Sequence, residues 1–424
     1  MTYSALPEDY AARALSLCIM QPTVSGGDAG IFRRLHTLLR QLFPRLFSLC
    51  SCETLGGGAL LLHLPGTPEG QPLVFLSHLD VVSPGDISAW TYPPFGGETH
   101  GGYIYGRGAA DMKGHLVALL TAAEGLLSEG WQPGGDIWLA FSCDEETRGG
   151  SMAAMARLLQ ARGVRPAFIL DEGGNISQPF SLTRKPFATV GVAEKGRLLF
   201  SLSCTAPRAL EELSRAAARI SRIHPRARLC DPVLSDMLPA MRPLMNGRDR
   251  FCLSHGRLFH GSLLHRLSRT ATGAITRTQL SLWRQSGDAL LGEIPTLHYS
   301  ASIQPGDSAE ALLRQVRRCI RRAPITLSVQ CMEEPGALSP ASGPAWDALC
   351  TAIAVHFPGT VIVPSLLAGG TDARRMEALC PQVYRFSPFI LPQDELLRVH
   401  GIDERLSLEN LNRGVAFFRQ MLQA

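Results

Sequence analysis

The stretch PLVFLSHLD, residues 72–80, decides the fold class, because it is an apolar run that ends directly in His78 and Asp80. The runs DIWLAFSCDEE (136–146) and PAFILDEGG (166–174) have the same layout and also end in acidic residues. Short apolar runs bounded by turn residues are typical of buried parallel strands. In an open α/β sheet the ligand site lies beyond the carboxyl ends of such strands. We therefore expect the three polar ends to meet and to bind a metal ion.

The composition is that of a globular protein with more than one domain. The chain has 424 residues, of which 45% are hydrophobic and 18% are charged, and this length exceeds one ordinary core. Its formal net charge of +4 favours neither a nucleic-acid partner nor a membrane partner. The 11 cysteines show no Cys-x-x-Cys spacing, which is typical of reduced thiols in the cytoplasm. The first residues, MTYSALPEDY, lack the layout of a signal peptide, and no apolar run reaches the ~18 residues of a membrane span.

The order of the predicted elements divides the chain into a main domain and an insert. Early in the chain, strand-like and helix-like runs alternate, which predicts an α/β domain whose mostly parallel sheet is flanked by helices. The middle has half-exposed strands with amphipathic helices between and after them, which predicts a smaller α+β domain. The first pattern then returns. We assign 1–192 and 324–424 to the catalytic domain, and 193–323 to the insert.

Asp144, Glu145 and Glu146 place three negative charges directly after an apolar strand. Like charges this close are unfavourable unless a cation compensates them. A solvated acidic loop would not usually follow WLAFS so directly, so we interpret the cluster as part of a metal site. Adjacent glutamates point in different directions. One of them can therefore bind a metal while its neighbour acts as general base toward a bound water.

The other candidates are His78, Asp80, Asp111, Asp171 and His400, and each alone has an ordinary explanation. A histidine near an aspartate is common on surfaces, aspartates often cap helices or form turns, and a histidine can stand before a helix. Taken with the glutamates, they supply two imidazoles and three or four carboxylates, a mixture that suits Zn²⁺ or a related divalent ion. A carboxylate that bridges two such ions would give a two-metal hydrolytic site.

Nine short motifs, taken in order, resemble one known family of metalloenzymes. They are SHLDVV, WTYPPFGG, YIYGRGAADMKG, DEETRGG, LDEGG, VGVAEKG, GGTDAR, YRFSP and HGIDERLSLENL. The set resembles the dinuclear-zinc peptidase and deacylase family of carboxypeptidase S, glutamate carboxypeptidase, aminoacylase and succinyl-diaminopimelate desuccinylase. The carboxypeptidase S-like branch fits best, given WTYPPFGG, GVAEKG and HGIDER. The resemblance covers nearly the whole chain and implies a zinc-exopeptidase-like catalytic domain interrupted by a lid domain.

The resemblance also implies a ligand role for five of the candidates. His78 and Asp171 would hold one Zn²⁺, Glu146 and His400 would hold the other, and Asp111 would bridge the two. In such enzymes the peptide bond after the bridging aspartate is often cis. Co²⁺ or Mn²⁺ could replace Zn²⁺, since their oxygen and nitrogen ligand sets overlap.

Two further residues have catalytic roles in the resemblance. Asp80 would orient His78, and Glu145 would take a proton from the metal-bridging water and pass it to the leaving amine. The metals would lower the pKa of that water and polarise the scissile carbonyl. The loop that shapes the substrate end of the cleft contributes Gly369, Gly370 and Thr371.

The insert departs from the family's lid in three places. It runs SLSCTAPRALEEL, without the family's oxyanion-stabilising histidine. The family's lid asparagine and its carboxylate-gripping arginine fall at Gly292 and Ser302. Loss of one oxyanion donor can cost roughly a hundredfold or more in rate. Because the set of metal ligands and the base is complete, the first hypothesis is a metallopeptidase or amidohydrolase of carboxypeptidase or aminoacylase type. The alternatives are a metal-binding relative with low or no peptidase activity, or a hydrolase of a different bond.

The expected partners follow from the same resemblance. They are a small peptide or an acyl-amino-acid substrate, with no nucleic acid and no membrane. The family's lid domain often dimerises, so a homodimer through the insert is a further expectation. The expected location is the cytoplasm.

Overall fold

The computed structural model describes residues 6–147, 149–178, 185–230, 232–245, 247–255, 258–259, 261, 264–265, 275–287, 292–321 and 323–424. Within these ranges the α-helices are α1 (Tyr10–Ile19), α2 (Ala29–Leu42), α3 (Pro44–Leu49), α4 (Lys113–Ser128), α5 (Gly150–Ala161), α6 (Ala209–Ile220), α7 (Leu238–Ala240), α8 (Gly247–Ser254), α10 (Ala309–Ile320), α11 (Pro344–His356), α12 (Ala373–Met376), α13 (Gln393–Leu396) and α14 (Leu408–Met421). No helix of the described part is both long and apolar enough to cross a membrane.

The strands are β1 (Ser51–Leu55), β2 (Ala59–Leu64), β3 (Leu73–His78), β4 (Thr99–His100), β5 (Tyr103–Tyr105), β6 (Ile137–Ser142), β7 (Phe168–Asp171), β8 (Ile176–Ser177), β9 (Phe187–Glu194), β10 (Gly196–Ser203), β11 (Gln279–Ser286), β12 (Thr296–Ile303), β13 (Thr326–Glu333), β14 (Val361–Leu367), β15 (Val383–Arg385) and β16 (Arg405–Ser407). They form one large sheet, one four-stranded sheet and one three-stranded sheet.

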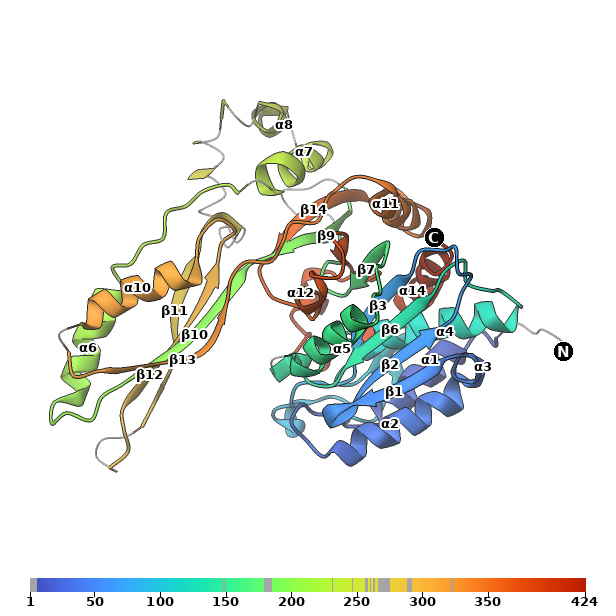
Figure 1. Cartoon of the computed structure of the whole chain (residues 1–424), viewed down its shortest axis with the longest axis horizontal. Coiled ribbons are helices and arrows are strands. Elements are labelled where there is room, and N and C mark those ends of the chain that lie inside the picture. Colours follow the sequence, from blue (N-terminus) through green and yellow to red (C-terminus); the bar gives the residue numbers. More distant parts are fainter. Residues whose placement is uncertain are drawn as a thin grey trace. The chain divides into compact units, whose positions relative to one another are not determined.

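The large sheet has the order β1-β2-β6-β3-β7-β15-β9-β14, and β8 pairs with β9. Its central strands β6, β3, β7 and β15 are parallel (Figure 1). On either side β2 pairs with β6 and β9 pairs with β15, both antiparallel. Because the central strands are parallel, their carboxyl ends lie at the same edge of the sheet.

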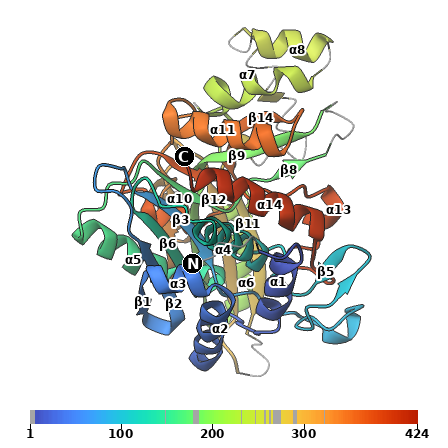
Figure 2. The same ribbon diagram turned by 90° about the vertical axis from the view of Figure 1, so that its right-hand side faces the viewer.

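Helices cover both faces of this sheet. α4, α14 and α1 pack together on one face, while α5 and α12 lie on the other (Figures 1 and 2). α4 is surrounded by protein, and its residues from Lys113 to Leu127 are all buried, as expected of a helix that is apolar on all sides. The core between these layers includes Phe75, Leu119, Phe141 and Phe418, whose side chains are fully buried.

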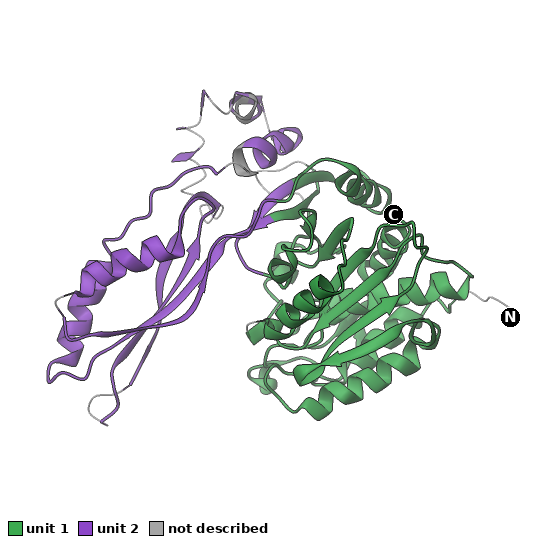
Figure 3. Cartoon of the chain, in the orientation of Figure 1, with its two compact units in different colours: residues 1–192, 339–363, 371–424 green, residues 193–338, 364–370 purple. Residues whose placement is uncertain are grey.

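The chain divides into two compact units (Figure 3). The first comprises residues 1–192, 339–363 and 371–424, and the second comprises residues 193–338 and 364–370. The second unit has the antiparallel sheet β11-β12-β10-β13. α6 and α10 pack on one face of that sheet, with a core that includes Phe200, Leu213, Tyr299 and Val316.

The predicted α/β fold class is confirmed. Each run quoted for the sheet forms a strand, namely β3, β6 and β7, and the centre of the sheet is parallel with helices on both faces. One prediction needs correction in detail. The structure divides the chain at 338/339 rather than at 323/324, because β13 pairs with β10 and so belongs to the second unit. β13 is a largely exposed edge strand, so it lacks the apolar signal from which the other strands were predicted.

Candidate metal centre

The strand ends bring the first ligands together. β3 and β6 pair in parallel with His78 opposite Ser142. The acidic cluster follows two residues after Ser142, so it stands beside the loop that leaves β3. Glu145 and Glu146 lie in a short 3₁₀ turn at that point. Their backbone N–H groups both donate to the Asp80 carboxylate, each over 3.2 Å. The carboxylate of Asp80, one of the candidates from the sequence, therefore holds the turn that carries Glu145 and Glu146.

Asp111 lies between the two histidines. Its Oδ1 is 3.0 Å from Nε2 of His78, and its Oδ2 is 2.9 Å from Nε2 of His400. The loop before it contains Gly108, which has a φ of 86°. A Cβ at that glycine would lie 2.6 Å from the Val81 side chain, so only glycine lets the loop approach this closely. The peptide bond from Asp111 to the next residue is cis, as the resemblance implies.

Glu146 completes the second half of the arrangement. Its Oε1 is 3.2 Å from Nε2 of His400. The potential ligand atoms of His78, Asp111 and Glu146 all lie within 4.8 Å of one another. His400 reaches the same group from a distant part of the chain, with a left-handed φ of 61°. Four of the five predicted ligands are thus brought to one place.

The fifth predicted ligand, Asp171, is held differently. It is buried at the end of β7, where Oδ1 accepts the N–H of Glu172 over 2.8 Å and Oδ2 accepts the N–H of Ala373 over 2.7 Å. Its neighbour Glu172 instead lies beside the first imidazole, with Oε1 3.3 Å from Nε2 of His78. Glu172 is not among the residues predicted from the sequence. The signal available was its position in LDEGG, directly after a strand end.

Asp80 contacts His78 as predicted, but through its backbone carbonyl more closely than through its carboxylate. Nδ1 of His78 is 2.9 Å from the backbone carbonyl oxygen of Asp80 and 3.5 Å from its carboxylate. The nearer acceptor is therefore the carbonyl. The carboxylate is fully buried, and its shorter contacts are with Ser25 and with the turn at Glu145. Both groups belong to one residue, so Asp80 contacts the imidazole and the acidic turn together.

A buried ion pair holds two loops of the centre. Arg107 and Glu404 are each 1% exposed, and Nη1 of the arginine is 2.7 Å from Oε2 of the glutamate. The Glu404 carboxylate also accepts the backbone N–H groups of Gly108, Ala110 and Asp111. Arg107 donates to the carbonyl oxygen of His400 over 3.2 Å. The ion pair therefore fixes the backbone of both the bridging aspartate and the distant histidine.

The electrostatics of the cluster indicate an excess of negative charge. Burial, with repulsion from neighbouring carboxylates, raises the pKa of Glu145 to about 9 and that of Glu172 to about 8. Burial and Asp171 likewise raise the pKa of Asp372 to about 7. Hydrogen bonds to Asp111 and Glu146 raise the pKa of His400 to about 10. Protonated histidine and a divalent cation are alternative ways to neutralise these carboxylates, and the oxygen and imidazole donors fit such a cation.

The predicted substrate contacts are less informative. Thr371 belongs to the first unit, where its hydroxyl accepts the N–H of Ala373 over 3.3 Å. Gly369 and Gly370 belong to the second unit. The assignment of all three as substrate contacts stays a prediction. Of the lid positions, Gly292 has a φ of 76°, and the Ser302 hydroxyl donates to the carbonyl oxygen of Ala368.

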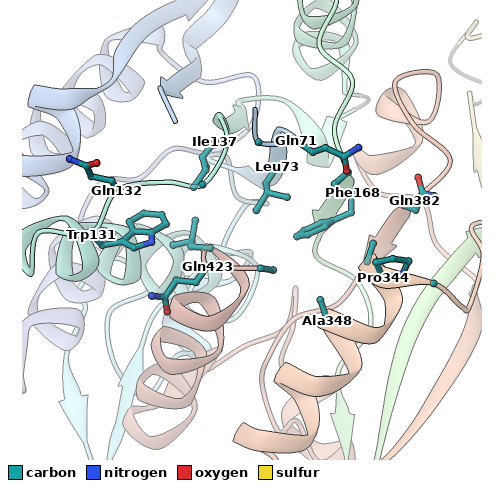
Figure 4. Close-up of a pocket in the computed structure, with 18 of the residues that line it drawn as sticks. Gln71, Leu73, Trp131, Gln132, Ile137, Phe168, Pro344, Ala348, Gln382 and Gln423 are labelled. Carbon is teal, nitrogen blue, oxygen red and sulfur yellow. The ribbon is translucent and has the colours of Figure 1, made fainter. Parts of the chain in front are cut away.

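A cavity of about 780 Å³ in the first unit lies away from this centre (Figure 4). Its lining includes Leu73, Ile137 and Phe168, which are the first residues of β3, β6 and β7. The metal-ligand candidates follow the opposite ends of the same strands. The cavity therefore does not coincide with the chemistry, and its glutamine and aromatic lining contains no candidate metal ligand.

Comparisons with known proteins show the family. A sequence model of peptidase family M20/M25/M40 matches residues 74–424. The chain is 29% identical to the probable carboxypeptidase S-like 2 of Dictyostelium discoideum, over 100% of this chain and 86% of that protein. It is 30% identical to the N-fatty-acyl-amino acid synthase/hydrolase PM20D1 of Mus musculus, over 97% of this chain and 86% of that protein.

Solved structures share the fold at low sequence identity. The M20 family metallo-carboxypeptidase Sso-CP2 of Sulfolobus solfataricus gives a TM-score of 0.74 at 13% identity, covering 97% of this chain and 98% of that one. Human carnosine dipeptidase 1 gives a TM-score of 0.69 at 14% identity, covering 98% and 97%. At this level of identity the likeness shows the fold alone.

Proposed function

The chain belongs to peptidase family M20/M25/M40, and from this premise we propose that it is a two-metal hydrolase that cleaves an amide bond of a peptide or of an N-acyl amino acid. One observation carries the proposal. The two oxygens of Asp111 face two different imidazoles, at 3.0 Å from His78 and 2.9 Å from His400. A single carboxylate between two such donors is the arrangement expected of a bridging ligand in a two-metal site.

The ligands divide into two sets that share Asp111. Glu146 and His400 would hold one ion. At the other, His78 would be joined by Glu172, which lies 3.3 Å from its imidazole, in place of the predicted Asp171, whose two oxygens accept backbone N–H groups. Bound ions, which we propose to be Zn²⁺ with Co²⁺ or Mn²⁺ as substitutes, would lower the pKa of water and polarise the scissile carbonyl. The buried ion pair of Arg107 and Glu404 would keep the two loops that carry Asp111 and His400 in register, since it binds the backbone of both.

Glu145 is the proposed general base. Its backbone N–H is fixed by Asp80, which leaves the carboxylate to accept a proton from the attacking water and then to deliver it to the leaving amine nitrogen. Burial and neighbouring carboxylates raise the pKa of Glu145 to about 9. The ionised form that a base requires therefore depends on nearby positive charge, which the ions would supply.

The relatives indicate a substrate class. The probable carboxypeptidase S-like 2 and the N-fatty-acyl-amino acid synthase/hydrolase PM20D1 carry names that refer to peptide bonds and to acyl-amino-acid amides. Both bonds are secondary amides next to an amino acid, so one mechanism serves both. We propose a cytoplasmic enzyme of this class and leave the choice between carboxypeptidase and aminoacylase type to a substrate panel.

A second candidate rests on the lid. Ser302 and Gly292 stand where the family has groups that contact the substrate, and the lid histidine has no counterpart in SLSCTAPRALEEL. A metal-binding relative with low or no peptidase activity, or a hydrolase of a different bond, would have no need of those contacts. Bound metal without turnover of any amide in the panel would favour this candidate.

Replacing the base tests the first proposal. We expect Glu145→Gln to lower turnover of the best dipeptide or N-acyl amino acid by roughly a hundredfold or more, since a positioned base contributes that much. Metal content, measured by elemental analysis, should not change. Glu409→Gln is the matched control, because Glu409 is exposed and pairs only with Arg413 among the contacts described. Full activity in Glu145→Gln would remove this residue as the base.

A further inference from the structure

Residues 21–25 form a segment near the start of the chain that lies against the metal centre. Between α1 and α2, Val24 forms a parallel bridge with Val81, just beyond the end of β3. The N–H of Val81 donates to the carbonyl oxygen of Thr23 over 3.0 Å, and the N–H of Ser25 donates to the carbonyl oxygen of Val81 over 3.0 Å. The Thr23 hydroxyl donates to the carbonyl oxygen of Leu79 over 2.6 Å. The segment thus acts as an extra strand beside the loop that carries Asp80.

A buried lysine fixes the same segment from its other side. Lys113 is fully buried and directly follows the bridging-ligand loop. Its Nζ donates to the carbonyl oxygen of Cys18 over 3.0 Å and to that of Gln21 over 2.6 Å. The segment is therefore attached to both metal-ligand loops by bonds to its backbone. The Ser25 hydroxyl lies 3.3 Å from the carbonyl oxygen of Val81, and its shorter contact is with a side chain.

The Ser25 hydroxyl contacts the carboxylate of Asp80. Its Oγ donates to Oδ2 over 2.5 Å, which is the shortest described contact of that carboxylate. The remaining contacts of the carboxylate are the N–H groups of Glu145 and Glu146 at 3.2 Å and Nδ1 of His78 at 3.5 Å. Asp80 is fully buried, so no bulk water can replace a missing donor without rearrangement.

We propose that Ser25 is a positioning residue of the metal centre. Its hydroxyl fixes the rotamer of the Asp80 carboxylate, and through it the imidazole of His78 and the turn of Glu145 and Glu146. The described contacts of the Ser25 hydroxyl are with Asp80 and with the carbonyl oxygen of Val81, and neither is a proposed metal ligand. The segment also precedes residues 74–424, the part of the chain that matches the family. The inference rests on the proposed two-metal function and extends the centre to a residue that neither the family match nor the sequence motifs select.

The experiment compares three variants in the full chain. Ser25→Ala removes the hydroxyl, and Ser25→Thr retains one. Ser88→Ala is the matched control, because the Ser88 hydroxyl donates to an aspartate, Asp86, over 2.6 Å at an exposed site and has no described contact with the candidate ligands. Each protein is loaded with Co²⁺. Its visible absorption spectrum is recorded, and its Co²⁺ affinity is measured by competition with a chromophoric chelator. Turnover is measured separately on the best amide substrate.

We expect Ser25→Ala to weaken Co²⁺ binding by about tenfold and to change the cobalt spectrum, because the Asp80 residue that orients His78 loses a partner of its carboxylate. The value of kcat should fall by a similar factor with KM nearly unchanged, since the Ser25 hydroxyl acts through Asp80. Ser25→Thr should restore affinity and spectrum, and Ser88→Ala should match the wild type in both.

Two results would overturn the inference. One is a Ser25→Ala protein with wild-type cobalt affinity and spectrum. The other is a Ser25→Thr protein as impaired as Ser25→Ala, which would show that the hydroxyl is not the cause. Failure of the proposed function looks different, because the wild type itself would then hydrolyse no amide, while its cobalt affinity and spectrum would still test the contact of Ser25. A wild type that binds no Co²⁺ would overturn the inference as well.

Discussion

At the scale of single residues, Asp111 decides what the centre can do. Its side chain is 17% exposed and stands between two imidazoles that are 322 positions apart in the sequence. A carboxylate that bridges two cations must be ionised. At the same site the raised pKa values of Glu145 and Glu172 show that ionisation of those two carboxyl groups is unfavourable. Although burial opposes ionisation, the hydrogen bonds from His400 and His78 hold the pKa of Asp111 below its ordinary value.

The bridging role leads to a prediction about metal content. Asp111→Asn keeps the size of the side chain but replaces one oxygen by an N–H₂ group, which cannot ligate a cation. We expect the bound divalent metal to fall by about half or more, because a bridging carboxylate serves both ions. Elemental analysis of the purified variant checks this. Asp86→Asn, at an exposed aspartate, should keep the full content, and an unchanged content in Asp111→Asn would contradict the bridge.

A second residue-scale prediction concerns pH. Lys195 is 2% exposed, its Nζ donates to the carbonyl oxygen of Arg277, and burial lowers the pKa of Lys195 from 10.5 to about 8. Below about pH 8 both the folded and unfolded states carry the proton. Between that pH and 10.5 the unfolded state binds more protons, so the free energy of unfolding attributable to this lysine rises with pH.

Comparison with Lys195→Met isolates this effect from other titrating groups. The free energy of unfolding of the wild type minus that of the variant should increase from about pH 7 to about pH 10. Denaturant unfolding at the two pH values measures it. A difference that stays constant, or decreases, would contradict the lowered pKa.

At the scale of elements, the centre depends on how loops are joined. The loop after β5 and the loop before β16 are both held by the pair of Arg107 and Glu404, and β16 and β5 themselves pair antiparallel. Gly106 also donates its N–H to the carbonyl oxygen of Glu404. A ligand from the early part of the chain and one from its last part are therefore fixed by the same polar network.

Breaking one partner of this pair should be costly. Glu404→Gln leaves the Arg107 guanidinium buried without a counter-charge, which typically costs about 3–5 kcal/mol. We expect the free energy of unfolding to fall by that amount. Glu53→Gln breaks an ion pair with Arg162 that is more than a third exposed, and there the loss should stay under about 1 kcal/mol. Equal losses in the two variants, measured by denaturant unfolding, would contradict the role of the buried pair.

At the scale of the whole molecule, the two units differ in charge. The second unit has 21 Lys and Arg against 12 Asp and Glu, whereas the first has 20 against 25. The net charge of the whole chain, +4, does not reveal this difference between the units. All of the candidate ligands belong to the acidic first unit. That unit should therefore gain most from bound cations, because a ligand stabilises the part of the protein that binds it.

Removal of metal tests this. Treatment with a chelator should lower the thermal unfolding midpoint, and added Zn²⁺ should restore it, since metal at a hundred times its Kd contributes about 2.7 kcal/mol. Differential scanning calorimetry measures the shift. Asp111→Asn should show a smaller response to the chelator than the wild type. A midpoint that the chelator leaves unchanged in the wild type would contradict metal binding.

The α/β class, the three strand ends and most of the candidate ligands could be predicted from the amino-acid sequence. These features are local, because an apolar run, a turn and the polar residue that follows are contiguous in the chain. The second boundary of the insert was misplaced because the last strand of the insert lacks such a local pattern. β13 is an exposed edge strand that belongs to the insert because it pairs with β10. The residues of β13 alone do not show which strand it pairs with.

Which side chains meet depends on how the folded chain packs. It placed Glu172 beside His78, while the oxygens of Asp171 accept backbone N–H groups. It brought the Ser25 hydroxyl onto the Asp80 carboxylate across 55 positions. Contacts of this kind depend on directions and on distances of about 3 Å between atoms far apart in the chain. Such distances are set when the strands and loops pack, so no local pattern could have fixed them in advance.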